Sequence, residues 1–255
     1  MSILEAKNVV KTFGALRAVD NFSLDLEEGS IVGLIGPNGA GKTTFFSTVM
    51  GIHKPDQGEI RLKGDRIEGL RPWQISRRGL VKTFQIPRAL KNLTVLENMM
   101  IPPRNQAGEN FVRAILRGKK VQEREKQVLN KALSLLQEGG LYDRRNDDTS
   151  ELSVGQSKLL EVTRALMTDP DVLLLDEPTA GTTTEETKPI MEYIQRLNVE
   201  KNITFLVVEH KMGVIMNLCQ ERIVVLVNGQ HFAEGTATEI QGNEEVKEVY
   251  LGKGT

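Results

Sequence analysis

Gly36-Pro37-Asn38-Gly39-Ala40-Gly41-Lys42-Thr43-Thr44 decides the fold, because its first eight residues fit the pattern G-x-x-x-x-G-K-[ST]. The glycines allow backbone conformations that a β-carbon forbids, so several N–H groups can point at one anion. The apolar run 31–35 predicts a short buried strand, and we expect a helix to begin near Gly41 and add its positive end. The stretch therefore predicts a phosphate-binding loop; the alternative is a glycine turn that only joins strand to helix.

Two side chains of this loop have chemistry suited to a nucleotide. Lys42 can reach the outer phosphates, and the Thr43 hydroxyl can bind a magnesium ion. A site of this kind needs a further acid, and the apolar run 172–175 ends in Asp176 and Glu177. Because ligands of parallel sheets lie at the carboxyl ends of the strands, we expect both acids beside the loop. Asp176 suits magnesium, often through water, and Glu177 is placed to polarise an attacking water.

Runs of β-type composition alternate along the chain with segments of helical composition. We expect strands at 23–26, 31–35, 172–175, 203–208 and 222–227. This alternation predicts an α/β fold with a largely parallel sheet covered on both faces. Asn228-Gly229, between two apolar runs, predicts a tight hairpin. Residues 111–139 have apolar side chains near helical spacing among many charged ones, which indicates a helical insertion.

The composition excludes several classes of protein. The chain has 255 residues and a net charge of −1, which argues against bulk binding to nucleic acid. Its single cysteine, Cys219, cannot form an internal disulfide, so we expect a reducing compartment. The longest apolar runs are far shorter than the roughly 18–20 residues that cross a bilayer. Residues 1–13 carry charges and no long apolar stretch, so we expect no signal peptide.

A second motif narrows the class. Leu152-Ser153-Val154-Gly155-Gln156, before a helical stretch, resembles the signature motif of the ATP-binding-cassette (ABC) ATPases. Gln85 resembles that family's Q-loop glutamine, and His210 resembles its switch histidine. Phe13 resembles the aromatic residue that stacks on adenine. These parts follow one another in the family's order, and the resemblance covers the chain from Leu4 to Gly252.

The resemblance implies a P-loop NTPase (RecA-like) core with a parallel sheet, an N-terminal antiparallel β-subdomain and an inserted helical subdomain. The whole chain, 1–255, would be one ABC ATPase domain. Residues 1–86 and 167–255 would form the nucleotide-binding core with the β-subdomain, and 87–166 the helical subdomain with the signature. Within the family the chain is similar to the ATPase subunits of branched-chain amino-acid importers, through stretches 81–85, 93–98 and 246–252.

The resemblance also implies a set of site residues. The catalytic residues would be Glu177, His210, Lys42 and Gln85, and the metal ligands Thr43, Gln85 and Asp176. ATP would be bound by Phe13, Gly36, Pro37, Asn38, Gly39, Ala40, Gly41, Lys42, Thr43, Thr44 and, across a dimer, Ser153, Gly155 and Gln156. The cofactors would be ATP and Mg²⁺, and the reaction would be ATP hydrolysis that drives membrane transport.

The implied partners follow from the family's assembly. Two ATPase subunits would close head-to-tail around two ATP molecules, as a homodimer or a heterodimer. They would dock on transmembrane permease subunits, with a solute-binding protein as an indirect partner and no nucleic acid. The expected location is therefore cytoplasmic, peripheral on the inner membrane.

Three features depart from expectation. The family usually has glycine at Val154, where a β-carbon would loosen contact with a phosphate. After Gly181 the family has leucine or methionine and then Asp or Asn, but this chain has Thr182 and Thr183. Pro189 falls in an expected helix, which we predict to start around residue 187 so that proline lies in its first turn.

Three alternative functions stay open from sequence alone. The first is another transport task in the superfamily, such as lipid or lipopolysaccharide export. The second is a soluble ABC protein of translation or DNA repair, although those usually have two fused cassettes or long coiled-coil insertions. The third is an ATP-binding regulatory module without turnover.

Overall fold

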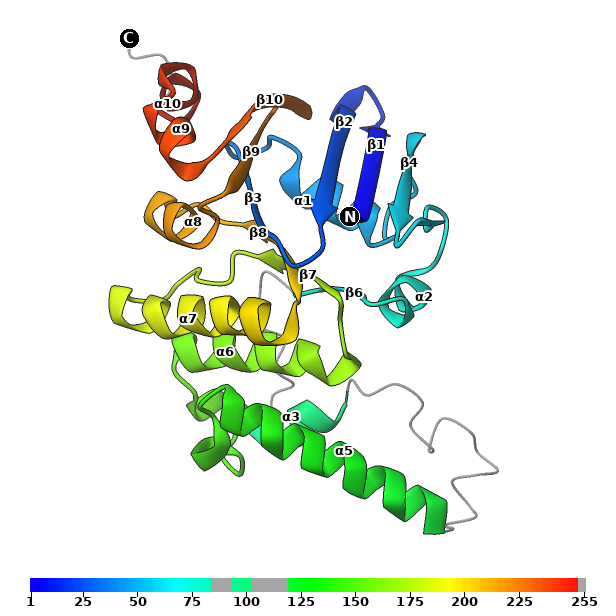
Figure 1. The fold of residues 1–255 in the computed structure, drawn as a ribbon, viewed down its shortest axis with the longest axis vertical. Coiled ribbons are helices and arrows are strands. Elements are labelled where there is room, and N and C mark those ends of the chain that lie inside the picture. The colour runs from blue at the N-terminus through cyan, green and yellow to red at the C-terminus, as the bar shows by residue number, and fades with distance from the viewer. Residues whose placement is uncertain (84–92, 102–118, 252–255) are drawn as a thin grey trace. The chain divides into compact units, whose positions relative to one another are not determined.

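The computed structural model describes residues 1–83, 93–101 and 119–251. The chain divides into two compact units. Met1–Gln85, Pro170–Ala180 and Thr187–Thr255 form the first, and Ile86–Asp169 with Gly181–Glu186 forms the second. Both β-sheets belong to the first unit (Figure 1).

One sheet is antiparallel and has four strands in the order β2-β1-β4-β5. The strands are β1 (Ser2–Phe13), β2 (Leu16–Glu27), β4 (Gln57–Leu62) and β5 (Asp65–Arg66). The strand predicted at 23–26 lies inside β2, where Phe22, Leu24 and Leu26 are buried and the residues between them are exposed. This alternation gives the sheet one apolar face.

The other sheet has six strands in the order β10-β9-β3-β8-β7-β6. They are β3 (Ile31–Ile35), β6 (Leu80–Lys82), β7 (Val172–Asp176), β8 (Thr204–Val208), β9 (Arg222–Val227) and β10 (Gln230–Gly235). All neighbouring pairs are parallel except β9 and β10, which are joined by the predicted Asn228-Gly229 turn. The predicted α/β class with a parallel sheet and an antiparallel β-subdomain is confirmed.

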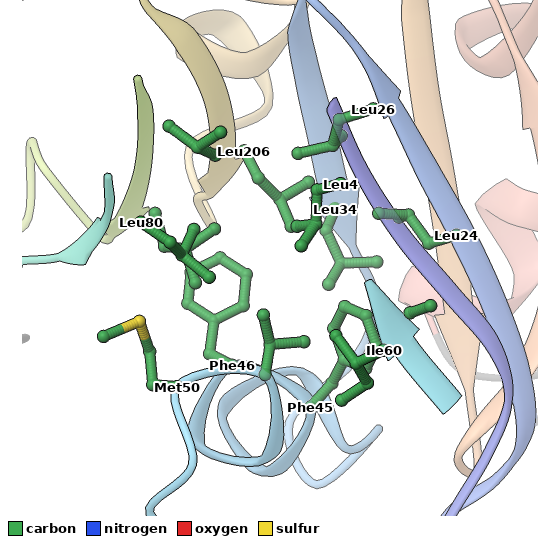
Figure 2. Packing of buried hydrophobic residues seen from close by; sticks show 14 of the residues in the cluster. Leu4, Leu24, Leu26, Leu34, Phe45, Phe46, Met50, Ile60, Leu80 and Leu206 are labelled. Carbon is green, nitrogen blue, oxygen red and sulfur yellow. The ribbon is translucent and has the colours of Figure 1, made fainter. Parts of the chain in front are cut away.

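The core of the first unit lies between the two sheets and around helix α1 (Lys42–Val49). Phe45 and Phe46 of α1 point into this core (Figure 2). The Phe22 and Phe45 rings meet edge to face at 4.9 Å. Successive residues of β3 face opposite ways. Leu34 belongs to this core, whereas a β-carbon on Gly33 would meet Ile215 of α8 (Met212–Leu218) at 3.2 Å. Helices therefore cover both faces of β3.

The remaining helices of the first unit are α2 (Pro72–Arg77), α9 (Ala237–Gly242) and α10 (Glu244–Leu251), while α7 (Thr184–Lys201) spans the boundary of the units. The predicted start of α7 near residue 187 is wrong. The helix begins at Thr184, so Pro189 lies in its second turn rather than its first. Thr183 and Glu186 cap the earlier start, and the proline costs α7 one backbone hydrogen bond.

The described part of the second unit is helical. It contains α3 (Val95–Met100), α5 (Lys119–Glu138), α6 (Val154–Ala165) and short 3-10 turns at Tyr142–Arg144, Thr149–Glu151 and Leu166–Thr168. The buried residues of α5 follow helical spacing: Val128, Ala132, Leu135 and Leu136. The predicted helical insertion is confirmed for 119–138, whereas 111–118 lies outside the described residues.

Candidate functional site

The predicted phosphate loop follows β3 and leads into α1. Gly41 occupies the N-cap position of α1 with φ +106°, a conformation that favours glycine. A β-carbon on Gly41 would lie 2.1 Å from the Ala18 carbonyl oxygen, so the close approach of β2 also requires glycine. Among the described residues no side chain caps α1, and its first turn contains no acid. The first N–H groups of α1 are therefore not capped by a carboxylate, which favours an anionic ligand.

Seven consecutive residues of the loop, 38–44, line a pocket of about 410 Å³. The sequence also predicted Glu177 and His210 for this site, and both line the same pocket. Five other lining residues were missed by sequence reasoning: Leu16, Arg17, Ala18, Val208 and Asn228. Only the tertiary structure brings these residues to the pocket. The start of β2 contacts the turn after β9 through a 2.8 Å hydrogen bond from Asp20 N to Gly229 O.

Lys42 lies beneath the loop with only 6% of its surface exposed. Its ammonium donates to the carbonyl oxygens of Gly36 at 2.6 Å and Pro37 at 3.0 Å. Burial lowers the pKa of Lys42, and the attraction of Glu177 and Asp176 acts in the opposite direction. The lysine is therefore fixed inside the loop and coupled electrostatically to both predicted acids.

Glu177 and His210 come together although 33 positions separate their numbers in the sequence. Glu177 follows β7 and His210 follows β8, and the two strands are parallel neighbours. The Nε2 atom of His210 lies 3.0 Å from Oε1 of Glu177. Glu177 has φ +52°, and its N–H donates to Val208 O at 2.8 Å. The parallel strand ends predicted Glu177 for this edge, whereas His210 was assigned to the site only by the family resemblance.

A buried carboxylate, Glu209, joins the two loops that carry Glu177 and His210. Its Oε1 accepts hydrogen bonds from the N–H of Thr179 at 2.7 Å and from the Thr179 hydroxyl at 2.6 Å. Lys211 adds a bond from its ammonium to Thr179 O at 3.0 Å. Sequence reasoning missed Glu209; the available signal was an acid directly after an apolar strand, at a position where burial requires a partner.

Oxygen ligands suited to magnesium are present at the same edge of the sheet. The Thr43 hydroxyl is exposed to the pocket, and Asp176 is the last residue of β7 with 2% exposure. Within the described residues no three His, Cys, Asp or Glu side chains form a metal cluster, so most ligands of an ion would come from water and phosphate. The Thr43 hydroxyl and the Asp176 carboxylate fit a magnesium ion that takes its other ligands from water and phosphate. Gln85 lies outside the described residues.

The predicted signature residues lie at the start of α6, in the second unit. Ser153 caps the helix by accepting from Gln156 N at 3.2 Å, and Gln156 accepts in return from Ser153 N at 3.0 Å. The Gly155 N–H donates to the Glu186 carboxylate at 3.2 Å. Val154 is 47% exposed at the first helical position, so its side chain is not needed for packing.

Thr183, one of the two departures after Gly181, caps α7. Its hydroxyl accepts from Glu186 N at 3.3 Å, and its N–H donates to Glu186 Oε2 at 3.1 Å. Threonine is itself a favourable N-cap residue, so this departure leaves the start of α7 capped. The Ser153 hydroxyl, Thr183 and Gly155 N–H lower the pKa of Glu186, with Ser153 the largest cause.

Phe13, the predicted adenine platform, ends β1 and is 44% exposed. Its ring meets His53 edge to face at 5.1 Å, and the Lys11 ammonium lies 5.5 Å from its centroid. Leu16 rather than Phe13 lines the pocket, with 66% of its own surface exposed. A role for Phe13 in stacking stays a prediction.

Comparison with known proteins places this geometry in a family. A family model described as ABC transporter matches residues 19–180, and one described as branched-chain amino acid ATP-binding cassette transporter matches 230–255. The chain belongs to the ABC transporter family. The family match includes the loop 36–44, the signature, and Asp176 and Glu177 at the end of β7.

Relatives within the ABC family match over nearly the whole chain. The high-affinity branched-chain amino acid transport ATP-binding protein LivG of Salmonella typhimurium is 39% identical over 251 residues, 98% of each chain. The corresponding protein BraF of Pseudomonas aeruginosa is 38% identical over 251 residues, again 98% of each. The predicted resemblance to this group of ATPase subunits is confirmed.

Solved ABC cassettes share the fold. A nucleotide-free ATP-binding cassette from an ABC transporter superposes with a TM-score of 0.87 at 35% identity, covering 99% of this chain and 100% of that one. A dimeric cassette in a post-hydrolysis state bound to ADP and Pi gives 0.74 at 27% identity, covering 92% and 98%. No helix in the described ranges combines the length and apolar character that a membrane span requires.

Proposed function

We propose that this chain is the ATP-hydrolysing subunit that powers uptake of branched-chain or related amino acids through a membrane transporter. One observation carries the hydrolytic part: Glu177 and His210, 3.0 Å apart, line the same pocket as the uncapped start of α1. The amino-acid assignment is supported by the printed functions of LivG and BraF and by the match at 230–255.

The residues of the first unit suit a sequence of roles in hydrolysis. The N–H groups of 38–44 would bind the phosphates, and Lys42 would leave its carbonyl partners to bind the outer ones. Mg²⁺, held by Thr43, Asp176 and Gln85, would neutralise charge on the phosphates when bound. Glu177 would orient the attacking water, and His210 would hold Glu177 and contact the terminal phosphate.

The second unit supplies a different part of the proposed site. Ser153, Gly155 and Gln156 at the start of α6 would meet the ATP held by a second ATPase subunit, in a head-to-tail dimer. The solved dimeric cassette supports this assembly. We further propose that 1–86 with 167–255 and 87–166 act as core and helical subdomains. The dimer would dock on permease subunits at the cytoplasmic face of the inner membrane, with a solute-binding protein as an indirect partner.

The test is phosphate release by the purified chain and by Glu177→Gln. We expect the wild type to hydrolyse ATP and Glu177→Gln to bind ATP with similar affinity but to release phosphate about 10²–10⁴ times more slowly. Glu221→Gln, a change at an exposed carboxylate after α8, serves as the matched control. Unchanged turnover in Glu177→Gln removes Glu177 from its role.

The transport part needs a second measurement. Co-purification of the chain with a membrane permease, and leucine uptake by vesicles that contain the complex, would support the assignment. A complex that hydrolyses ATP without accumulating any branched-chain amino acid would contradict it.

A further inference from the structure

A buried ion pair lies at the ends of two neighbouring strands, at a residue that the sequence did not single out. Lys82 is the last residue of β6 and Asp176 the last of β7. The strands are parallel, with Lys82 in register with Leu174. The Lys82 ammonium lies 2.9 Å from Oδ2 of Asp176, and the two side chains are 12% and 2% exposed.

The surroundings hold Lys82 in this position. Its ammonium lies 5.5 Å from the centroid of the Phe46 ring, which is fully buried in the core. The backbone beyond Lys82 is tied to β7 as well, because Thr83 N donates to Leu174 O at 2.9 Å. The Thr83 hydroxyl in turn lies 3.4 Å from Asp176 N, as acceptor. The lysine is thus built into the sheet rather than reaching in from solvent.

Lys82, not Lys42, is the cation in contact with Asp176. Lys42 directs its ammonium at the carbonyl oxygens of Gly36 and Pro37, and it interacts with Asp176 only at longer range. The other charged neighbours at this edge, Glu177 and His210, pair with each other. A carboxylate buried as deeply as Asp176 needs a partner charge, since an unpaired buried charge is strongly destabilising.

We propose that Lys82 is a positioning residue of the ATPase: it holds the Asp176 carboxylate until the magnesium of Mg·ATP arrives, and the two cations compete for that carboxylate. The inference rests on the proposed function, which assigns Asp176 to the metal. Two consequences follow from the exchange of partners. Without Lys82 the protein is less stable in the absence of Mg²⁺, and Mg²⁺ binds more tightly because no resident cation has to be displaced.

The experiment removes the charge and titrates the metal. Lys82→Met keeps the length of the side chain without its charge, and Lys82→Gln, which retains a donor, replaces it if the methionine variant does not fold. Binding of a fluorescent ATP analogue is followed while Mg²⁺ is titrated, and thermal unfolding is recorded with and without Mg·ADP. Lys63→Met is the matched control, because Lys63 pairs with Asp171 at 2.6 Å in an exposed bridge.

We expect the half-saturating Mg²⁺ concentration of Lys82→Met to fall about tenfold. Its midpoint of unfolding should drop in the absence of Mg·ADP and recover most of that loss in its presence. Lys63→Met should behave as the wild type in both measurements. A merely structural lysine would lower the unfolding midpoint equally in both conditions.

Two results would overturn these ideas separately. If the wild type shows no Mg²⁺-dependent binding of the analogue, the proposed function fails, and the positioning role fails with it. If the wild type binds, but the charge-neutral variant needs the same or more Mg²⁺ or loses equal stability in both conditions, only the role of Lys82 fails.

Discussion

The N-termini of α1 and α6 both contain a glycine, and both are proposed to bind a phosphate of ATP. They differ in whether side chains of the protein already accept hydrogen bonds from their first N–H groups. At α1, no described side chain caps the helix and the first turn has no acid. At α6, Ser153 and Gln156 form a capping box, and the Glu186 carboxylate accepts from Gly155 N–H. The first terminus presents unused donors to a pocket, whereas the second has its donors satisfied by its own chain.

The glycines show the same contrast. Gly41 is held in a left-handed conformation against the Ala18 carbonyl oxygen, a backbone atom that cannot move aside. Gly155 has no positive φ, and its β-carbon would lie 2.7 Å from Cβ of Glu186. Backbone geometry therefore fixes the α1 terminus, whereas at the α6 terminus the Glu186 carboxylate accepts the glycine N–H. This difference suits the proposed roles, in which α1 binds the ATP of its own chain and α6 meets the ATP held by a second subunit.

Among the substitutions that test this comparison, the largest effect is expected from Lys42→Ala, which removes the cation at the α1 terminus. We expect ATP hydrolysis to fall about 10²–10³-fold, because a charged donor to the phosphates is lost from a buried site. The measurement is phosphate release under saturating ATP, with the exposed Lys54→Ala as control. Turnover within a few-fold of the wild type would mean that the α1 terminus binds phosphate without Lys42.

Gly41→Ala and Gly155→Ala compare the two glycines directly. We expect Gly41→Ala to lower the free energy of unfolding by about 1–3 kcal/mol, because it combines backbone strain with a clash. Gly155→Ala should cost less, because Gly155 has no positive φ and its substitution adds a clash without backbone strain. Urea unfolding measures both, and Gly64→Ala separates strain from clash, because Gly64 has φ +84° with no atom within 4 Å of its β-carbon. Equal losses in the free energy of unfolding for Gly41→Ala and Gly155→Ala would show that the two glycines do not differ in this way.

The smallest effect is expected from Glu186→Gln, which removes the carboxylate from α6. The Ser153 hydroxyl, then Thr183 and Gly155, hold the pKa of Glu186 below its ordinary value of 4.5. Its charge therefore stabilises the fold above about pH 4.5, and this contribution is lost as the pH falls through the lowered folded-state pKa. Urea midpoints of variant and wild type should differ at pH 7 and converge near pH 3.

Glu185→Gln is the control for that comparison. Glu185 lies in the same first turn of α7, so its substitution changes the charge near the helix dipole without touching α6. The same pH-dependent difference in Glu185→Gln would show that the dipole, and not the bond to Gly155, is responsible.

Sequence reasoning predicted the parts that are encoded by consecutive residues. The loop 36–44 needs only its own glycines and the strand before it, and the Asn228-Gly229 turn needs only its own two positive φ angles. The order of strands and helices then predicted that Asp176 and Glu177 would lie beside the loop, because parallel strands end at one edge, whereas His210 was assigned to the site by the family resemblance alone. The predicted start of α7 is wrong, because the capping bonds between Thr183 and Glu186 stabilise an earlier start despite Pro189.

The tertiary structure alone decided the contacts between residues of different elements. Lys82 meets Asp176 through the register of β6 and β7, Glu209 meets Thr179 across two strand ends, and Glu186 meets Gly155 across 31 positions. Nothing in the local sequence specifies such partners, since a charged side chain has the same local pattern whether it faces solvent or a buried opposite charge. The motifs and their order along the sequence were enough to predict the family and the position of its loops. The register of the strands and the burial of the side chains determined which charged partner each acid contacts.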